Sequence, residues 1–149
     1  QFSVFLPNRV GRMLDVVQMF DTPYLTLAGM SVVDATDHAV VRLLTSNSQL
    51  ARRVLDREEL HFSETEVLAV EIESDKTLVA LCRALLSVEV NIQYAYPLFV
   101  QPRGKPVVAI QTDDIIISGQ ILRRKLFTLL AENDLGDNAS RNDPGNPNN

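Results

Sequence analysis

The chain has 149 residues and a hydrophobic fraction of 46%, which suffices for the core of one ordinary domain or of two very small ones. Its net charge of −5 argues against nucleic acid as a partner, because phosphate binding needs concentrated positive charge. The N-terminus has no signal-peptide pattern, and no apolar run approaches the roughly 20 residues that a membrane helix needs. The single cysteine, Cys82, excludes an intrachain disulfide, so we expect a buried thiol in a cytoplasmic protein without a membrane partner.

Apolar side chains in the first half of the chain alternate between strand spacing and helix spacing. Gly29 is expected to mark a bulge, residues 34–37 a hairpin turn, and residues 46–48 the N-cap of a helix. The predicted elements are, in chain order, a strand at 2–6, a helix at 12–20, strands at 24–33 and 39–44, a helix at 50–60 and a strand at 62–72. The order is therefore β-α-β-β-α-β.

The second half of the chain begins this order again. A shift of 65 superposes the first helices of the two halves, a shift of 67 their Val-Val strands, and a shift of 71 their second helices. Such an internal repeat indicates a duplicated unit, with chance similarity of amphipathic segments as the alternative. No convincing final strand is seen, because Leu135 is the only large apolar residue after the last helix. The predicted elements are a helix at 77–86, strands at 92–100 and 107–110 joined by a turn at 102–106, and a helix at 119–130.

We therefore predict an α+β fold of two ferredoxin-like βαββαβ units in tandem, each an antiparallel sheet with helices on one face. A unit of about 60 residues would have a marginal core, and each open sheet has unpaired edges. The sheets are accordingly expected to pair, within the chain or between chains. The expected boundaries are residues 1–66 and residues 67–133, followed by a disordered tail at 134–149 that is rich in Asn, Asp, Gly and Pro.

The passage from the first strand to the first helix contains a recognisable motif. The strand at 4–6 leads into the turn Pro7-Asn8-Arg9-Val10-Gly11, and the next helix opens Arg12-Met13-Leu14. This strand–Asn-x-x-Gly–helix passage, within a duplicated unit, resembles the ACT family of small-molecule-binding regulatory domains. The chain is similar to the stand-alone tandem-ACT proteins of bacteria over residues 2–133. In the second turn Glu73 stands at the asparagine position and Lys76 at the glycine position, so ligand binding is not expected there.

The resemblance implies a regulatory, allosteric protein that has no cofactor and is not an enzyme. It implies that an amino acid binds at the interface between adjacent ACT-like units of a homodimer and signals by altering how those units pair. The alternative is a ligand-free protein–protein interaction module, acting as the regulatory subunit of an amino-acid-biosynthetic enzyme. A ferredoxin-like enzyme with an unrecognised site is a third hypothesis.

The first turn has the chemistry to hold a small zwitterion. A helix that begins near Gly11 directs free N–H groups and the positive end of its dipole toward an anion such as an α-carboxylate. Gly11 permits close approach of a ligand, and the Asn8 amide can both donate and accept hydrogen bonds. We expect Asn8 to orient the ligand, the backbone of residues 9–13 to hold its carboxylate, and Arg9 or Arg12 to add charge. The alternative is that Asn8 only completes a turn and that both arginines are solvated.

The residues expected at the ligand site form two groups. In the turn they are Asn8, Arg9, Val10, Gly11, Arg12 and Met13. A strand of a neighbouring unit usually forms the opposite wall in the family, so by analogy the second group is Leu27, Ala28, Gly29, Met30, Gln93, Tyr94 and Tyr96. Tyr94 and Tyr96 point to the same face of their strand, and core packing, a dimer seam or an aromatic ligand cage would each explain that.

Catalytic and metal-binding patterns are poor in this sequence. His38 and His61 have no metal-ligand spacing with other His, Cys or carboxylate groups, and both are expected at the surface. Asp113-Asp114 suggests either a divalent-ion site or, as we expect, the N-terminal cap of the segment that follows. No Ser/His/Asp order, phosphate-binding glycine loop or dinucleotide motif is present. We therefore predict no catalytic residues and no metal ligands.

Overall fold

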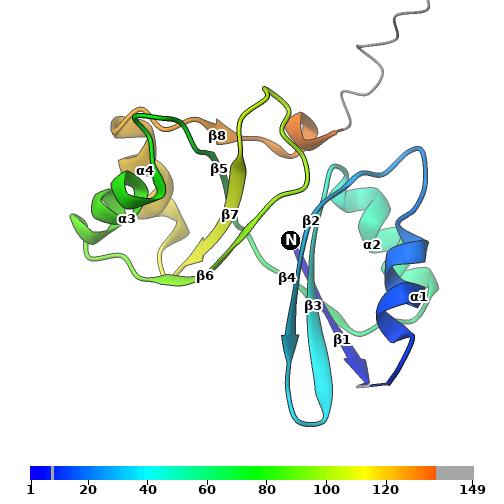
Figure 1. Ribbon diagram of the computed structural model, residues 1–149. Coiled ribbons are helices and arrows are strands. Elements are labelled where there is room, and N and C mark those ends of the chain that lie inside the picture. The colour runs from blue at the N-terminus through cyan, green and yellow to red at the C-terminus, as the bar shows by residue number, and fades with distance from the viewer. Residues whose placement is uncertain (8, 137–149) are drawn as a thin grey trace, which may run out of the picture.

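Two sheets face each other at the centre of the molecule, and two helices cover the outer side of each (Figure 1). This computed structural model describes residues 1–7 and 9–136. The first unit comprises, in chain order, β1 (Phe2–Pro7), α1 (Arg12–Met19), β2 (Leu27–Asp34), β3 (His38–Thr45), α2 (Ser48–Arg57) and β4 (Phe62–Glu64). The second comprises β5 (Leu68–Glu71), α3 (Leu78–Leu86), β6 (Ile92–Pro97), β7 (Val107–Thr112), α4 (Ile115–Arg124) and β8 (Leu129–Leu130), and is followed by a 3-10 helix, η1 (Glu132–Leu135).

Both sheets are antiparallel and share one strand order. The first is β2-β3-β1-β4 and the second is β6-β7-β5-β8. In the first sheet β1 pairs with β3 from Phe2 opposite Leu43 to Pro7 opposite His38. This is the arrangement of a ferredoxin-like unit, formed twice, so the predicted fold class is confirmed.

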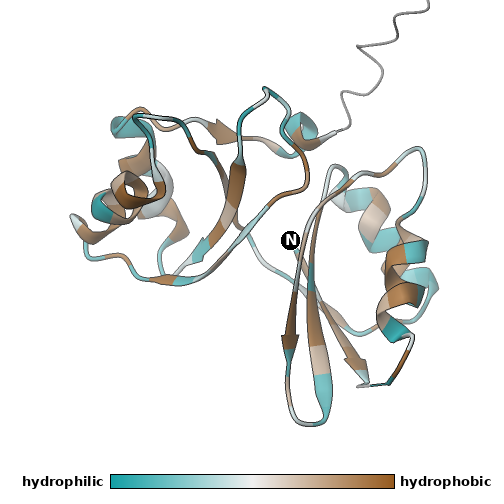
Figure 2. Ribbon diagram, viewed as in Figure 1, coloured by the Kyte–Doolittle hydropathy of each residue, from teal (hydrophilic) through white to brown (hydrophobic). Residues whose placement is uncertain are grey.

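Each unit has its own apolar core between the sheet and its helices, where the strands and the inner helix faces are most hydrophobic (Figure 2). Burial of such apolar surface is the main source of folding free energy, at roughly 25 cal/mol per Å². The buried members of the first core are Phe2, Val4, Leu6, Val16, Phe20, Leu25, Val41, Leu43, Ala51, Val54 and Leu55. Those of the second are Val70, Leu81, Ala84, Leu85, Val108, Ile110, Ile121, Leu122 and Phe127.

The second helices of the two units correspond at a shift of 67, so the predicted shift of 71 was wrong. The N-caps of α2 and α4 are Asn47 and Asp114, and each side chain accepts from the backbone N–H three residues on. Glu59 and Leu126, which follow the two helix ends, both have positive φ, at 53° and 64°. The structure thus repeats caps, helix lengths and exit turns together.

The last helix and the last strand lie elsewhere than the sequence predicts. The helix expected at 119–130 is α4, which begins at Ile115 and ends at Arg124. Leu129 and Leu130 then form β8 against β5, so the second sheet does have a fourth strand. The segment 62–72, expected as one strand, divides into β4 of the first sheet and β5 of the second.

Two further expectations differ from the structure. Cys82 is exposed, because the buried face of α3 is formed by Leu81, Ala84 and Leu85. Order also continues past the expected start of the tail at Asp134, because Leu135 of η1 is buried with only 2% of its surface exposed. Residues 137–149 of the expected tail lie outside the described residues. Within the described ranges the longest helices have 10 residues, and none is long and apolar enough to cross a membrane.

The inner faces of the two sheets pack against each other through a third apolar cluster. Ala28 of β2 and Leu44 of β3 meet residues that belong to the second unit, among them Tyr96 and Leu98. A backbone hydrogen bond of 2.7 Å from the Phe99 N–H to the Ala28 carbonyl fixes the two units to each other. The sheet faces that the helices leave open are therefore closed by the duplicated partner within the same chain.

Candidate functional site

The turn between β1 and α1 presents an open helix start. Gly11 is the N-cap residue of α1, with φ of 89° and ψ of −15°, and it has no side chain that could accept from the first-turn N–H groups. No described atom lies within 4 Å of where its Cβ would be, so the space beside it is open. Arg9, Val10 and Gly11 are exposed. Asn8, the predicted orienting residue, lies outside the described residues.

The other helix starts of the chain are closed by their own N-cap side chains. Asn47 accepts from the Leu50 N–H at 3.0 Å, Thr77 from the Ala80 N–H at 3.2 Å, and Asp114 from the Ile117 N–H. An N-cap acceptor satisfies one of the unpaired donors in the first turn of a helix. Among helices α1 to α4, only α1 therefore leaves these donors without an N-cap acceptor.

Arg12 and Met13 follow directly on this turn. Arg12 Nη1 lies 3.2 Å from an oxygen of Asp15, whereas its buried Nε finds no hydrogen-bond partner among the described residues. The Met13 side chain is partly exposed beside Leu14. The Arg9 N–H donates to the Pro7 carbonyl at 2.8 Å and the Arg12 N–H to the Arg9 carbonyl at 3.3 Å, so at this turn the N–H groups of Val10, Gly11 and Met13 remain without a backbone acceptor among the described residues.

The strand residues expected as the opposite wall lie at the other end of the first sheet. Met30 and Phe2 both pair with Leu43, so Met30 is level with the start of β1. The β1–α1 turn follows the other end of β1, roughly 17 Å away at about 3.3 Å per residue. One chain therefore does not bring the segment Leu27–Met30 together with the turn, and a ligand site made from both would need a second copy.

Ala28 and Gly29 are moreover covered by the second unit. Ala28 has no exposed surface, and a Cβ on Gly29 would overlap Cδ2 of Leu98 and lie 3.3 Å from Tyr96 Cε2. The register of β2 against β3 shifts between Leu27 and Gly29, so the expected bulge is present. The two residues thus serve the contact between units.

Tyr94 and Tyr96 form a polar cluster at this contact, while Gln93 is exposed. The two rings stack with centroids 6.5 Å apart, and the Arg42 guanidinium lies 3.8 Å from the Tyr94 ring centroid. The Gln1 side chain donates to the Tyr94 hydroxyl and accepts from the Tyr96 hydroxyl, both at 2.7 Å. Of the alternatives weighed for this pair, the structure shows packing between the units.

The environment of Tyr96 suits a neutral phenol. Burial raises the pKa of Tyr96 well above its ordinary value, because a phenolate would lose its hydration there. The neighbouring Tyr94 acts in the same direction, and Arg42 acts against it. Tyr96 therefore keeps the proton that its hydroxyl donates to the Gln1 side chain.

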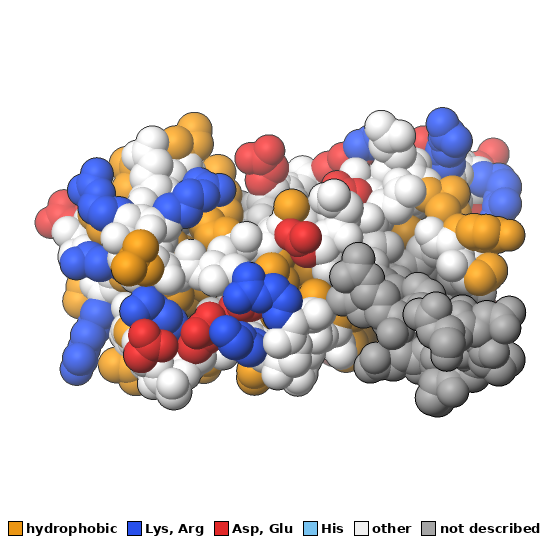
Figure 3. All heavy atoms as spheres, turned by 90° about the horizontal axis from the view of Figure 1, so that it is seen from above, with side chains coloured by type: hydrophobic (Ala, Val, Ile, Leu, Met, Phe, Trp, Pro, Cys, Tyr) orange, Lys and Arg blue, Asp and Glu red, His pale blue; other side chains and the backbone are white. Residues whose placement is uncertain are grey.

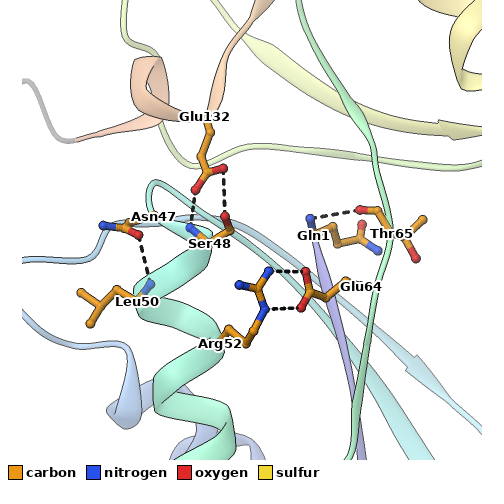
Figure 4. Close-up of polar contacts among 8 residues, drawn as sticks. All are labelled: Gln1, Asn47, Ser48, Leu50, Arg52, Glu64, Thr65 and Glu132. Carbon is orange, nitrogen blue, oxygen red and sulfur yellow. Dashed lines mark hydrogen bonds and ion pairs between the residues drawn. The ribbon is translucent and has the colours of Figure 1, made fainter.

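A cavity of about 490 Å³ lies beside this contact, between the start of α2 and the segment that follows β8. Glu132 of η1 accepts from both the backbone N–H and the hydroxyl of Ser48, the second at 3.1 Å (Figure 4). Arg52 holds Glu64 through two bonds of 2.6 and 2.7 Å, and these hydrogen bonds lower the pKa of Glu64. The contact of Ser48 with Glu132 thus ties the two units together, whereas the Arg52–Glu64 pair lies within the first unit.

The sequence analysis missed the residues that link the units. Arg42 stands among apolar residues of β3, and this interruption of the apolar pattern was the available signal. Nothing in the sequence relates Ser48 to Glu132, because they are 84 positions apart in different units. The contact becomes visible only once the two sheets face each other.

The turn of the second unit is closed by its own residues. Backbone hydrogen bonds run between Glu73 and Lys76 in both directions, and Glu73 also pairs with Lys105 at 2.9 Å. Thr77 is the N-cap of α3, as Gly11 is that of α1. Its hydroxyl caps the helix that Gly11 leaves open in the first unit.

The acidic pair and the histidines have structural surroundings. Asp114 caps α4, as expected, and Asp113 accepts from the Asn91 N–H at 3.0 Å. His38 and His61 are exposed. In the described part of the chain no group of His, Cys, Asp and Glu is arranged to hold a metal ion.

Comparisons with known proteins agree with this architecture. The family model of the ACT domain pair matches residues 1–138, whereas no curated protein matches the chain. A solved structure from Bacteroides thetaiotaomicron is similar with a TM-score of 0.77 at 23% identity, over 90% of this chain and 92% of that one. The ligand-free regulatory subunit of aspartate kinase from Thermus thermophilus is similar with a TM-score of 0.54 at 10% identity, over 83% of this chain and 89% of that one. At these identities the two likenesses establish the fold alone.

Proposed function

Because this chain belongs to the family of ACT domain pairs, we propose that it is a regulatory protein whose first unit binds a free amino acid at the β1–α1 turn. One observation carries the proposal: α1 begins at Gly11 without an N-cap side chain, whereas α2, α3 and α4 are capped. Unpaired N–H groups at the positive end of a helix attract a carboxylate. The first turn is thus the place in the duplicated fold that is left open for an anion.

The groups around the turn match a zwitterion. The backbone N–H groups of Val10, Gly11 and Met13 would hold the α-carboxylate, because those of Arg9 and Arg12 already donate to backbone carbonyls. The Arg12 guanidinium, whose Nε lacks a partner among the described residues, would add positive charge. The amide of Asn8 would meet the ammonium or carboxylate group, since an amide both donates and accepts. The positive φ of Gly11 favours glycine at this position, and because glycine has no Cβ a ligand can approach the backbone closely.

A second copy of the chain would complete the site. Val10 in the turn is fully exposed, and Met13 and Leu14 in the first turn of α1 also expose apolar surface. Phe5 and Val33 also leave about two fifths of their surfaces open, at 42% and 43%. Apolar surface of this kind supports pairing between chains, and we propose a homodimer whose partner strand covers the bound amino acid.

Signalling would follow from the way the units pair. A ligand shifts an equilibrium only if it binds one arrangement more tightly than the other. An amino acid held between the first turn of one chain and a strand of the next favours the paired arrangement, and a protein that recognises this arrangement responds. Allosteric regulation by an amino acid is therefore a property of the dimer in this proposal.

A thermal-shift screen against the proteinogenic amino acids at millimolar concentration tests the proposal. We expect at least one amino acid to raise the unfolding temperature of the wild-type chain, because a ligand that binds only the folded state stabilises it. Asn8→Ala should abolish the shift, whereas Asn91→Ala, which changes an exposed asparagine just before β6, should preserve it. No stabilisation of the wild type by any amino acid would contradict a sensing role.

A second candidate is a ligand-free module that acts as the regulatory subunit of an amino-acid-metabolic enzyme. The closed turn of the second unit favours it, because Thr77 and the Glu73–Lys76 bonds use the donors that a ligand would need. Co-purification with an enzyme, together with insensitivity to every amino acid, would support this candidate over the sensor.

A further inference from the structure

A groove of about 360 Å³ lies on the helical side of the second unit, along α3 and beside the segment that leaves α4. Ala80 and Ala84 lie one turn apart on α3, and their side chains are only methyl groups, so they leave the groove open. Phe127, which belongs to the second core, also lines it. The groove is separate from the β1–α1 turn and from the cavity between the units.

Positive charge gathers around this groove. Lys76, Arg83 and Lys125 line it, against a single acid, Asp75, so its walls carry a formal charge of three minus one, or +2. Asp75 pairs with Lys76 at 3.2 Å, and no ion pair of Arg83 or Lys125 is found in the described ranges. The chain as a whole has a net charge of −5, yet Lys and Arg side chains gather over the second unit at the left of Figure 3.

The first unit lacks this charge at the corresponding positions. The helix caps and the buried helix residues show which positions of the two units correspond. The buried residues Val16 and Leu81 superpose at a shift of 65, which places Gly11 at the position of Lys76 and Gln18 at the position of Arg83. Glu58 is the C-cap of α2 as Lys125 is that of α4. A glycine, a glutamine and a glutamate thus stand where the second unit has three cations. The fold itself does not require the basic groove.

We propose that this groove binds a small molecule with two or more negative charges, either a phosphate ester or a polycarboxylate. A dianion would neutralise the +2 charge of the walls. The guanidinium of Arg83 suits bidentate contact with carboxylate or phosphate oxygens, and the lysines supply further charge. The Thr77 hydroxyl accepts from the Ala80 N–H, so its own proton remains available to donate to a ligand oxygen. The second unit would then sense a different class of molecule from the first.

Calorimetric titration of the full chain with pyrophosphate and, separately, with citrate tests this proposal at constant low ionic strength. We expect saturable binding of one anion per chain, weakened about tenfold or more by the double variant Arg83→Gln/Lys125→Gln, which removes charge-assisted contacts. The matched control is Arg57→Gln/Arg124→Gln, which removes the same charge at residues outside the groove and should bind as the wild type does.

The outcomes separate the two ligand chemistries. Binding of pyrophosphate alone identifies a phosphorylated ligand, and binding of citrate alone identifies a polycarboxylate. Absence of saturable binding by either anion, or equal loss in the control variant, would overturn the proposal. If the double variant does not fold, Lys125→Glu replaces it, because the first unit has Glu58 at that position. The amino-acid response and its loss in Asn8→Ala are expected to be unaffected by these variants, so the two proposals fail separately.

Discussion

Gly29 of β2 lies directly against Leu98, which follows β6, with no room between them for even a methyl group. The Phe99 N–H adjacent to Leu98 donates to the Ala28 carbonyl adjacent to Gly29, so backbone meets backbone at this point. Close approach of two backbones is one reason for a glycine within a strand. The pairing of the two units therefore depends on this position as much as on the larger apolar side chains around it.

Gly29→Ala is expected to destabilise the chain by about 1–3 kcal/mol, because the added methyl group forces Leu98 from its place. Denaturant unfolding measures the change. In Gly29→Ala/Leu98→Ala the clash disappears, so the double variant should lose less free energy of unfolding than the sum of the single variants, by about 1 kcal/mol. Gly136→Ala, where a Cβ meets only ordinary contacts, is the control. If the loss of free energy of unfolding in the double variant equalled the sum of the two single losses, the contact between Gly29 and Leu98 would be contradicted.

Glu132→Gln is expected to lower the free energy of unfolding by about 1 kcal/mol, because the carboxylate that bridges to the start of α2 loses its charge. Glu66→Gln provides a matched control, since Glu66 lines the same cavity without a hydrogen bond among the described residues. It should change stability by less than about 0.5 kcal/mol. Equal effects of the two variants would show that general charge, and not the bond to Ser48, matters.

Stability should fall at alkaline pH through Tyr96. Burial raises its pKa in the folded chain, so above about pH 10 the unfolded state loses the phenolic proton first and binds fewer protons than the folded state. The free energy of unfolding therefore decreases as the pH rises above that value, and this contribution is fully present below it. Unfolding curves at stepwise higher pH should show the decrease in the wild type and a smaller one in Tyr96→Phe. Tyr24→Phe, which changes an exposed ring, should leave the slope unaltered.

Gly11→Ala and Gly104→Ala separate stability from ligand binding. Both glycines have positive φ, at 89° and 73°, and open space at the Cβ position, so each variant should cost about 1–2 kcal/mol of backbone strain. Only Gly11→Ala should also weaken the thermal shift produced by an active amino acid. A similar loss of ligand response in Gly104→Ala would place the amino acid elsewhere or make its effect a general one.

Most of the fold could be predicted because its elements have strong local signals. The helix at Arg12–Met19 follows a clear apolar period, and the hairpin between β2 and β3 has the expected turn. The end of the second unit could not be predicted in this way. Strand β8 has only two residues, too few to show alternation, and α4 opens with Ile115-Ile116-Ile117, whose β-branched side chains indicate a strand. The Asp114 side chain caps this segment at its N-terminus and favours the helix that the structure shows.

For the candidate site too, the residues close together in the sequence could be predicted, and those brought together by the packing of the units could not. Residues 9–13 are contiguous, so the sequence could place them at one helix start. The structure shows that the N-cap residue of this helix, Gly11, has no side chain to cap it. The strand residues expected as the opposite wall were chosen by analogy with the family. Their surroundings depend on how the two sheets pack, which the sequence does not show. Arg42 against Tyr94, and Ala28 beneath Phe99, are contacts between distant segments that no local pattern contains. The tertiary arrangement alone reveals them.

Amide chemical shifts recorded during titration with an amino acid that stabilises the chain test the central claim most directly. If the open start of α1 holds the ligand, the largest changes should appear at the backbone amides of residues 9–13, and they should disappear in Asn8→Ala. Saturable changes confined to other segments, with the amides of residues 9–13 unmoved, would contradict it.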